Sequence, residues 1–128
     1  MNRQQRAYAK AKAAFELAKE HENETECAYL AAHGYKGPLY ALEGKIDADL
    51  YDALEIGICE NEDCAAAFSA SIDARKALVK AEDALIEYGI SISPAGIRDT
   101  LRSGVKRREI REKLIDLAFR LDMRTVRA

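Results

Sequence analysis

The chain has 128 residues, of which 48% are hydrophobic and 33% charged, and its formal net charge is −2. This balance argues against an intrinsically disordered chain, and no apolar run approaches the ~20 residues of a membrane-spanning helix. The first residues carry no apolar stretch, so we expect no secretory signal, no membrane role and a cytoplasmic location. An odd number of cysteines (Cys27, Cys59 and Cys64) favours free thiols over a disulfide framework.

The first expected helix spans about Gln4–His33, within residues 1–33. Its small residues recur at steps of three and four, which is typical of a helix lying along another helix. They are Ala7, Ala11, Ala14, Ala18, His21, Thr25, Ala28 and Ala32. A bulkier line runs beside them, at Tyr8, Phe15, Glu22 and Tyr29. Gly34 is expected to cap the C-terminus of this helix.

Residues 34–60 are expected to form a connector. It is rich in glycine, and Leu39–Leu42 is long enough for one helical turn. Asp47 is a suitable N-cap for a short helix that continues to about Glu55 and is interrupted at Gly57.

The second long helix is expected within residues 61–89, capped by Asn61 and ended by Gly89. Its own seam of three and four steps consists of Ala67, Ser71, Ala74, Leu78, Ala81, Leu85 and Tyr88. Two such seams predict two helices packed closely side by side. The connector is long enough for an antiparallel hairpin within one chain, and the alternative is a homodimer that uses the seam between two chains.

The C-terminal segment, residues 93–124, is expected to form a pair of helices. Ser93 followed by Pro94 is typical of a helix start, and Ser103–Gly104 should end the first helix. The second helix, about Val105–Met123, has an apolar face, and the tail from Thr125 should fray. Together these elements predict an all-α, single-domain chain over residues 1–128: a long antiparallel helical hairpin with an Ala-rich seam and additional short helices, in a small helical bundle.

Charge is unevenly distributed along this fold. Residues 1–19 hold five basic and one acidic residue, residues 20–63 two basic and twelve acidic, and residues 94–128 ten basic and five acidic. On the first helix the charges oppose the helix dipole, so local helix stability does not explain them. They serve either a partner-binding surface or neutralisation between segments of the chain, and the second interpretation is the simpler one.

Two charged surfaces are therefore the candidate sites. The hairpin should gather carboxylates at one end, which we call the acidic end: Glu20, Glu22, Glu24, Glu26, Glu60, Glu62 and Asp63. The C-terminal helix pair should carry a basic face: Arg98, Arg102, Lys106, Arg107, Arg108 and Arg111. The pair at residues 94–123 partly matches a DNA-binding helix-turn-helix. Asp99 and Ser103 stand where that motif prefers apolar residues, and the net acidity of the chain also weighs against it.

The sequence contains no Gly-x-Ser-x-Gly motif, no phosphate-binding loop and no glycine-rich dinucleotide-binding turn. A zinc site from Cys59, Cys64 and Cys27 with His21 or His33 lacks the usual C-x-x-C pairs. We therefore expect no catalytic residues, no metal and no cofactor. The leading interpretation is a small non-enzymatic adaptor or inhibitor that binds another protein through charged helical surfaces. The alternative is a DNA-binding regulator that uses residues 94–123.

Overall fold

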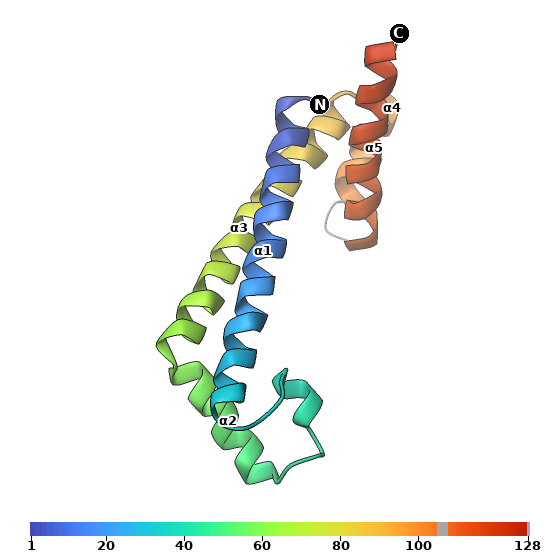
Figure 1. Ribbon diagram of the computed structural model, residues 1–128. Helices are drawn as coiled ribbons and strands as arrows, with labels where there is room; N and C mark the ends of the chain where they lie inside the picture. The colour runs from blue at the N-terminus through green and yellow to red at the C-terminus, as the bar shows by residue number, and fades with distance from the viewer. Residues whose placement is uncertain (105–107, 128) are drawn as a thin grey trace. The chain divides into compact units, whose positions relative to one another are not determined.

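The computed structural model describes residues 1–104 and 108–127, with the side chains of residues 1–104, 108 and 110–120. All regular structure in these ranges is helical, which confirms the all-α fold class (Figure 1). The elements in chain order are α1 (Arg3–Ala32), the 3₁₀ turn η1 (Leu39–Leu42), α2 (Ala48–Glu60), α3 (Glu62–Ser91), α4 (Ala95–Gly104) and α5 (Arg108–Arg127).

The chain divides into two compact units. Unit 1 consists of Met1–Lys12 and Lys76–Ala128, and unit 2 is Ala13–Arg75. Helices α1 and α3 each contribute one part to unit 1 and one part to unit 2. The single-domain organisation over residues 1–128 stays a prediction.

The antiparallel pairing of α1 with α3 occurs in both units, which confirms the predicted hairpin. In unit 1, Ala7 at the start of α1 and Ala84 near the end of α3 line one shallow trough. In unit 2, the Cys64 thiol at the start of α3 donates to the Thr25 carbonyl, near the end of α1, at a Sγ–O distance of 3.4 Å.

The seam on α3 was predicted well, whereas the seam on α1 was placed slightly off the contact face. Ala67, Ser71 and Leu85 of α3 are buried. On α1, however, five members of the predicted small-residue line are exposed: Ala7, Ala14, His21, Ala28 and Ala32. The half-buried line combines small and bulky residues in strict steps of three and four: Tyr8, Ala11, Phe15, Ala18, Glu22, Thr25 and Tyr29. Larger side chains bury more apolar area, so the contact face of α1 turns toward them.

The core of unit 1 joins the end of α3 to α5. It consists of the buried residues Leu85, Ile86, Ile90, Leu114, Ile115 and Ala118. Tyr8 of α1 packs at its edge, with its ring 6.1 Å from that of Phe119 in an edge-on arrangement. Asn2 and Gln5 close the start of α1 by exchanging backbone-to-side-chain hydrogen bonds of 2.9 and 2.8 Å, which form a capping box that was not predicted from the sequence.

Two glycines that were expected to end a helix lie inside one. Helix α3 continues through Gly89 to Ser91, and a Cβ at Gly89 would lie 3.0 Å from the Ala118 Cβ and 3.4 Å from its Cα. Helix α2 likewise continues through Gly57 to Glu60, and a Cβ at Gly57 would overlap the hydroxyl oxygen of Tyr29. Both glycines therefore permit close packing rather than chain reversal.

The core of unit 2 gathers the end of α1, η1 and α2 around buried Leu30, Leu39 and Leu54. Gly34 has a φ of +86° and caps α1 as predicted. The Tyr35 amide donates to the Leu30 carbonyl at 2.9 Å and the Gly34 amide to the Ala31 carbonyl at 3.0 Å, which is a Schellman arrangement.

The two predicted N-caps around α2 differ in outcome. The Asn61 side chain accepts a hydrogen bond from the Cys64 amide at 3.0 Å, so Asn61 caps α3 as predicted. Asp47 stands at the N-cap of α2 but makes no capping side-chain hydrogen bond.

The C-terminal helices differ from their predicted bounds. Ser103 and Gly104 belong to α4 instead of following it, and the predicted α5 start at Val105 lies outside the described residues. Helix α5 includes Thr125–Arg127, where fraying was expected, and the last residue of that tail, Ala128, is outside the described part.

Candidate functional site

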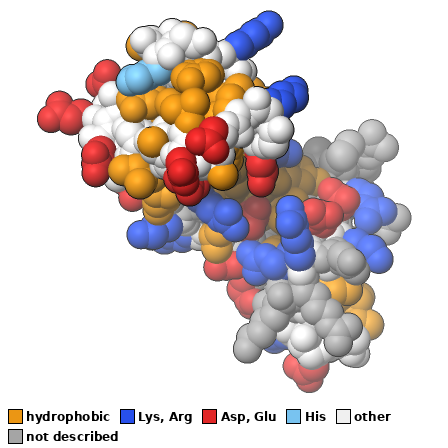
Figure 2. Space-filling model, turned by 90° about the horizontal axis from the view of Figure 1, so that it is seen from below, with side chains coloured by type: hydrophobic (Ala, Val, Ile, Leu, Met, Phe, Trp, Pro, Cys, Tyr) orange, Lys and Arg blue, Asp and Glu red, His pale blue; other side chains and the backbone are white. Residues whose placement is uncertain are grey.

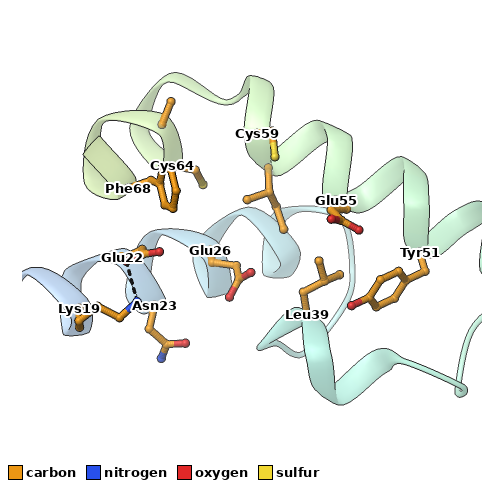
Figure 3. A pocket seen from close by; sticks show the side chains of 12 residues that line it. Lys19, Glu22, Asn23, Glu26, Leu39, Tyr51, Glu55, Cys59, Cys64 and Phe68 are labelled. Atoms are coloured by element: carbon orange, nitrogen blue, oxygen red, sulfur yellow. Dashed lines mark hydrogen bonds and ion pairs between the residues drawn. The ribbon is translucent and has the colours of Figure 1, made fainter. Parts of the chain in front are cut away.

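Unit 2 contains a groove of about 610 Å³ that lies among α1, η1, α2 and α3 (Figure 3). We call it the unit 2 groove. Its lining residues are Lys19, Glu22, Asn23, Glu26, Leu39, Tyr51, Glu55, Ile58, Cys59, Cys64, Ala65 and Phe68.

Helical spacing explains why these side chains meet. Glu22 and Glu26 are four residues apart on α1, and Cys64 and Phe68 are four apart on α3. Tyr51, Glu55 and Ile58 recur at i, i+4 and i+7 on α2. Residues at these spacings share one face of a helix. Each helix thus presents one face to the groove, and η1 adds Leu39.

The groove has an apolar lining that is left partly open. Leu39 and Cys64 are buried, whereas Phe68 is 56% exposed. Figure 3 shows Phe68 pointing from α3 toward α1, and Tyr51 pointing from α2 toward Leu39. In Figure 2, hydrophobic side chains gather on the part of unit 2 that faces the viewer, with Asp and Glu side chains around them.

The carboxylates of the groove are unequally neutralised. Glu22 pairs with Lys19 at 3.1 Å, drawn as the dashed line in Figure 3. Neither Glu26 nor Glu55 has an ion pair within the described part of the chain. Two carboxylates of the groove are therefore left without an ion pair among the described residues.

The pKa of Glu26 is raised above its ordinary value. Partial burial is the largest cause, and the neighbouring charge of Glu22 acts in the same direction. A hydrogen bond from the Leu39 backbone and the charge of Lys19 act against them. The net result is a carboxylate whose charge is disfavoured in the folded chain.

The carboxylates in and around the groove also act on the Tyr51 phenol. Its pKa is raised, first by desolvation and then by four carboxylates, those of Glu43, Glu55, Glu26 and Asp52. Negative charges from α1, from α2 and from the turn that follows η1 thus act on one point of the groove.

The two thiols that line the groove differ. Cys59 is exposed, whereas Cys64 is buried, and burial raises the pKa of the Cys64 thiol. Over the residues that the structure describes, no group of three or more His, Cys, Asp or Glu is placed to hold a metal ion. The zinc arrangement weighed from the sequence is therefore not assembled.

The predicted acidic end divides into several places within unit 2. Glu22 and Glu26 line the groove. Glu20 and Glu24, also on α1, are exposed and do not line it, and Glu60 and Glu62 are exposed at the α2–α3 junction. Asp63 borders a separate hollow of about 230 Å³ with Thr25, Ala28, Tyr29 and Asn61.

Sequence reasoning missed the contribution of α2 and η1 to the groove. Tyr51, Glu55 and Ile58 carry a helical spacing that was available, but the expected helix ended near Glu55 and so excluded Ile58. No sequence spacing relates Leu39 or Phe68 to the glutamates of α1. Tertiary packing alone brings these residues into one groove.

The predicted basic face lies in unit 1 and is partly neutralised there. Arg111 pairs with Asp83 at 2.6 Å and with Glu82 at 3.5 Å, and Arg102 pairs with Glu87 at 2.9 Å. These hydrogen-bonded pairs raise the pKa of both arginines. All three carboxylates belong to α3, so internal neutralisation accounts for this part of the basic face.

The remaining members of the basic face have separate outcomes. The Arg98 side chain donates to the Ser93 carbonyl at 2.8 Å and helps to join α3 to α4. Arg108 is exposed at the start of α5. Lys106 and Arg107 lie outside the described residues.

Comparison with protein-family models, with curated proteins and with solved structures finds no match to this chain. In the described part of the chain, no helix is both long enough and apolar enough to cross a membrane.

Proposed function

We propose that this chain is a non-enzymatic interaction protein, an adaptor or inhibitor, whose unit 2 groove holds a segment of another protein. The observation that supports the proposal is an open cavity of about 610 Å³ that combines apolar walls with two carboxylates, Glu26 and Glu55, that lack an ion pair among the described residues. Apolar recesses bordered by charge are typical of binding sites.

The chemistry of the groove favours binding over catalysis. The buried Cys64 thiol has a raised pKa, which disfavours the nucleophilic thiolate. The Glu22 carboxylate is already engaged with Lys19. What the groove offers a ligand is apolar area and negative charge.

The proposed function is tested by using the whole chain as bait and quantifying captured proteins by mass spectrometry. The groove variant is Glu22→Gln with Glu26→Gln, and its matched control is Glu20→Gln with Glu24→Gln, on the same helix but outside the groove. A partner that is lost with the groove variant and retained with the control is expected. Equal recovery of every captured protein by both variants would contradict the assignment.

DNA binding through α4 and α5 is the second candidate, because Arg108 is exposed at the start of α5. The ion pairs of Arg102 and Arg111 reduce the charge that this face offers to phosphates. A gel shift against pooled duplex DNA at two salt concentrations separates the candidates. A DNA binder shifts the duplex at low salt and loses affinity steeply at high salt, through counterion release.

A homodimer and a cytoplasmic location also remain proposals. Ala7, Ala11, Ala77, Ala81 and Ala84 border the trough of unit 1, where a second helix would meet little steric hindrance. Light scattering on the purified chain tests the dimer.

A further inference from the structure

We infer that the occupant of the unit 2 groove is a cationic amphipathic segment, which seats an apolar side chain against Leu39, Ile58 and Phe68 and places a lysine or arginine beside Glu26 and Glu55. This inference rests on the proposed function and names the chemistry of the partner.

The apolar part of the inference follows from the lining. Phe68 lines the groove and exposes more than half of its surface to solvent. A partner that covers this side chain would therefore bury additional apolar area. Leu39 is already fixed in the core of unit 2, and Ile58 packs against that core from α2. An apolar side chain of a partner would therefore meet a preformed surface and cover the Phe68 ring.

The cationic part follows from charge complementarity. Glu22 is paired with Lys19, but neither Glu26 nor Glu55 forms an ion pair within the described residues. Glu26 also lies partly out of water, so a cation placed beside it would meet a charge that solvent stabilises incompletely. An acidic partner segment would instead add to the repulsion already present.

Tyr51 strengthens the preference for a cation at the same place. Carboxylates from three segments act on its phenol, which marks a region of negative potential. Its ring also lines the groove, and ammonium and guanidinium groups are attracted to aromatic rings. The lysine or arginine of the partner thus has both a charge partner and an aromatic surface.

Lys19 sets a limit on where the partner cation binds. Its ammonium group neutralises Glu22 at 3.1 Å, on the side of the groove nearest the middle of α1. The free negative charge therefore lies on the side where α1 faces η1 and α2. Removing Lys19 releases Glu22 and should strengthen binding of a cationic segment.

The experiment selects a displayed library of random peptides against the whole chain, with counter-selection on a Glu26→Gln and Glu55→Gln variant. Lysine or arginine together with large apolar residues should be enriched among the selected peptides. One selected peptide is then synthesised with its basic residue retained or replaced by norleucine. We expect norleucine to weaken binding about tenfold, as for the loss of one charge pair of roughly 1.4 kcal/mol.

Matched variants locate the binding. Glu26→Gln with Glu55→Gln should reduce affinity for the basic peptide to that of the norleucine peptide, and Lys19→Ala should increase it. Phe68→Ser should weaken both peptides, because it removes an apolar contact of the groove. Phe68 is largely exposed, so its replacement leaves the core intact. Glu20→Gln with Glu24→Gln should change neither affinity.

The contrary outcomes are distinct. Selected peptides that require Phe68 but bind equally well with norleucine would overturn the cationic preference and leave the proposed function standing. Absence of any selected peptide would overturn the inference, while the capture experiment decides the proposed function separately. A dimer in light scattering that is abolished by Glu26→Gln with Glu55→Gln, without peptide binding, would show that a second copy occupies the groove.

Discussion

At the scale of single residues, Glu26 differs from Glu22, the other glutamate of α1 that lines the groove, because it has no ion pair among the described residues. It is half-buried, it lines the groove, and the pKa of its carboxyl group is raised, chiefly by burial. A raised folded-state pKa means that the fold favours the protonated form of this group. Glu26 therefore begins to oppose folding as the pH rises above its ordinary pKa, and the full cost is reached above its raised folded-state pKa.

Replacing Glu26 by Gln should raise the melting temperature slightly near neutral pH, because the neutral amide has no charge to desolvate. The gain should diminish as the pH falls through the raised pKa of Glu26 and disappear below its ordinary value, where the parent carboxyl group is also neutral. Thermal unfolding followed by circular dichroism over this pH range measures the difference. Glu20→Gln is the control, and a gain that persists in acid would refute the assigned cause.

The thiols give a second prediction at this scale. Cys59 is exposed, whereas Cys64 is buried and its pKa is raised. Iodoacetamide should therefore modify Cys59 first and Cys64 much more slowly, since the thiolate is the reacting form. Peptide mass spectrometry at timed intervals measures both rates, and the difference should vanish in denaturant. Equal rates in the folded chain would be incompatible with the described burial.

At the scale of elements, glycines allow helices to approach each other inside each unit. Gly89 lies against Ala118 of α5, and Gly57 lies against the Tyr29 ring. Both are inside helices, where glycine costs about 1 kcal/mol relative to alanine. Close packing offsets this cost. This explains why α2 continues through Gly57 and α3 through Gly89, although glycine often ends a helix.

Replacing Gly89 by Leu should destabilise the chain by about 1–3 kcal/mol, because the side chain must separate α3 from α5. Urea denaturation provides the measurement. Gly96→Ala is the matched control in α4, where a Cβ meets nothing within 4 Å, and it should be neutral or mildly stabilising. An unchanged denaturation midpoint for Gly89→Leu would show that α5 does not pack against α3 as described.

At the scale of the whole molecule, α1 and α3 are the continuous elements. Each passes through both units, and each unit has a separate cluster of buried side chains. Because a helix is cooperative along its length, loss of one cluster should weaken the same helices in the other unit. This continuity supports the expectation of a single folding domain.

The prediction at this scale is one unfolding transition. Leu85→Ala in unit 1 and Leu54→Ala in unit 2 should each lower the stability of the entire chain, by about 2–5 kcal/mol. Helicity by circular dichroism and site-specific hydrogen exchange in both units should report the same decrease. Two separated transitions, of which each substitution shifts only one, would show that the units fold independently.

The sequence by itself determined the helices, their antiparallel pairing and several of their ends. The seam of α3, the cap at Asn61 and the left-handed Gly34 are all readable because they depend on residues close together in the chain. The predicted acidic end includes Glu22 and Glu26, which line the unit 2 groove. Its other members lie outside the groove.

Only the tertiary structure decided how α1 is turned and which residues complete the groove. The contact face of α1 includes Tyr8 and Phe15, since burial of large side chains outweighs the close approach that alanines permit. Gly57 and Gly89 continue their helices because a neighbouring residue occupies the space of the missing side chain. The groove itself joins Glu26 to Leu39, Tyr51 and Phe68, and contacts between distant segments depend on packing that no local pattern encodes.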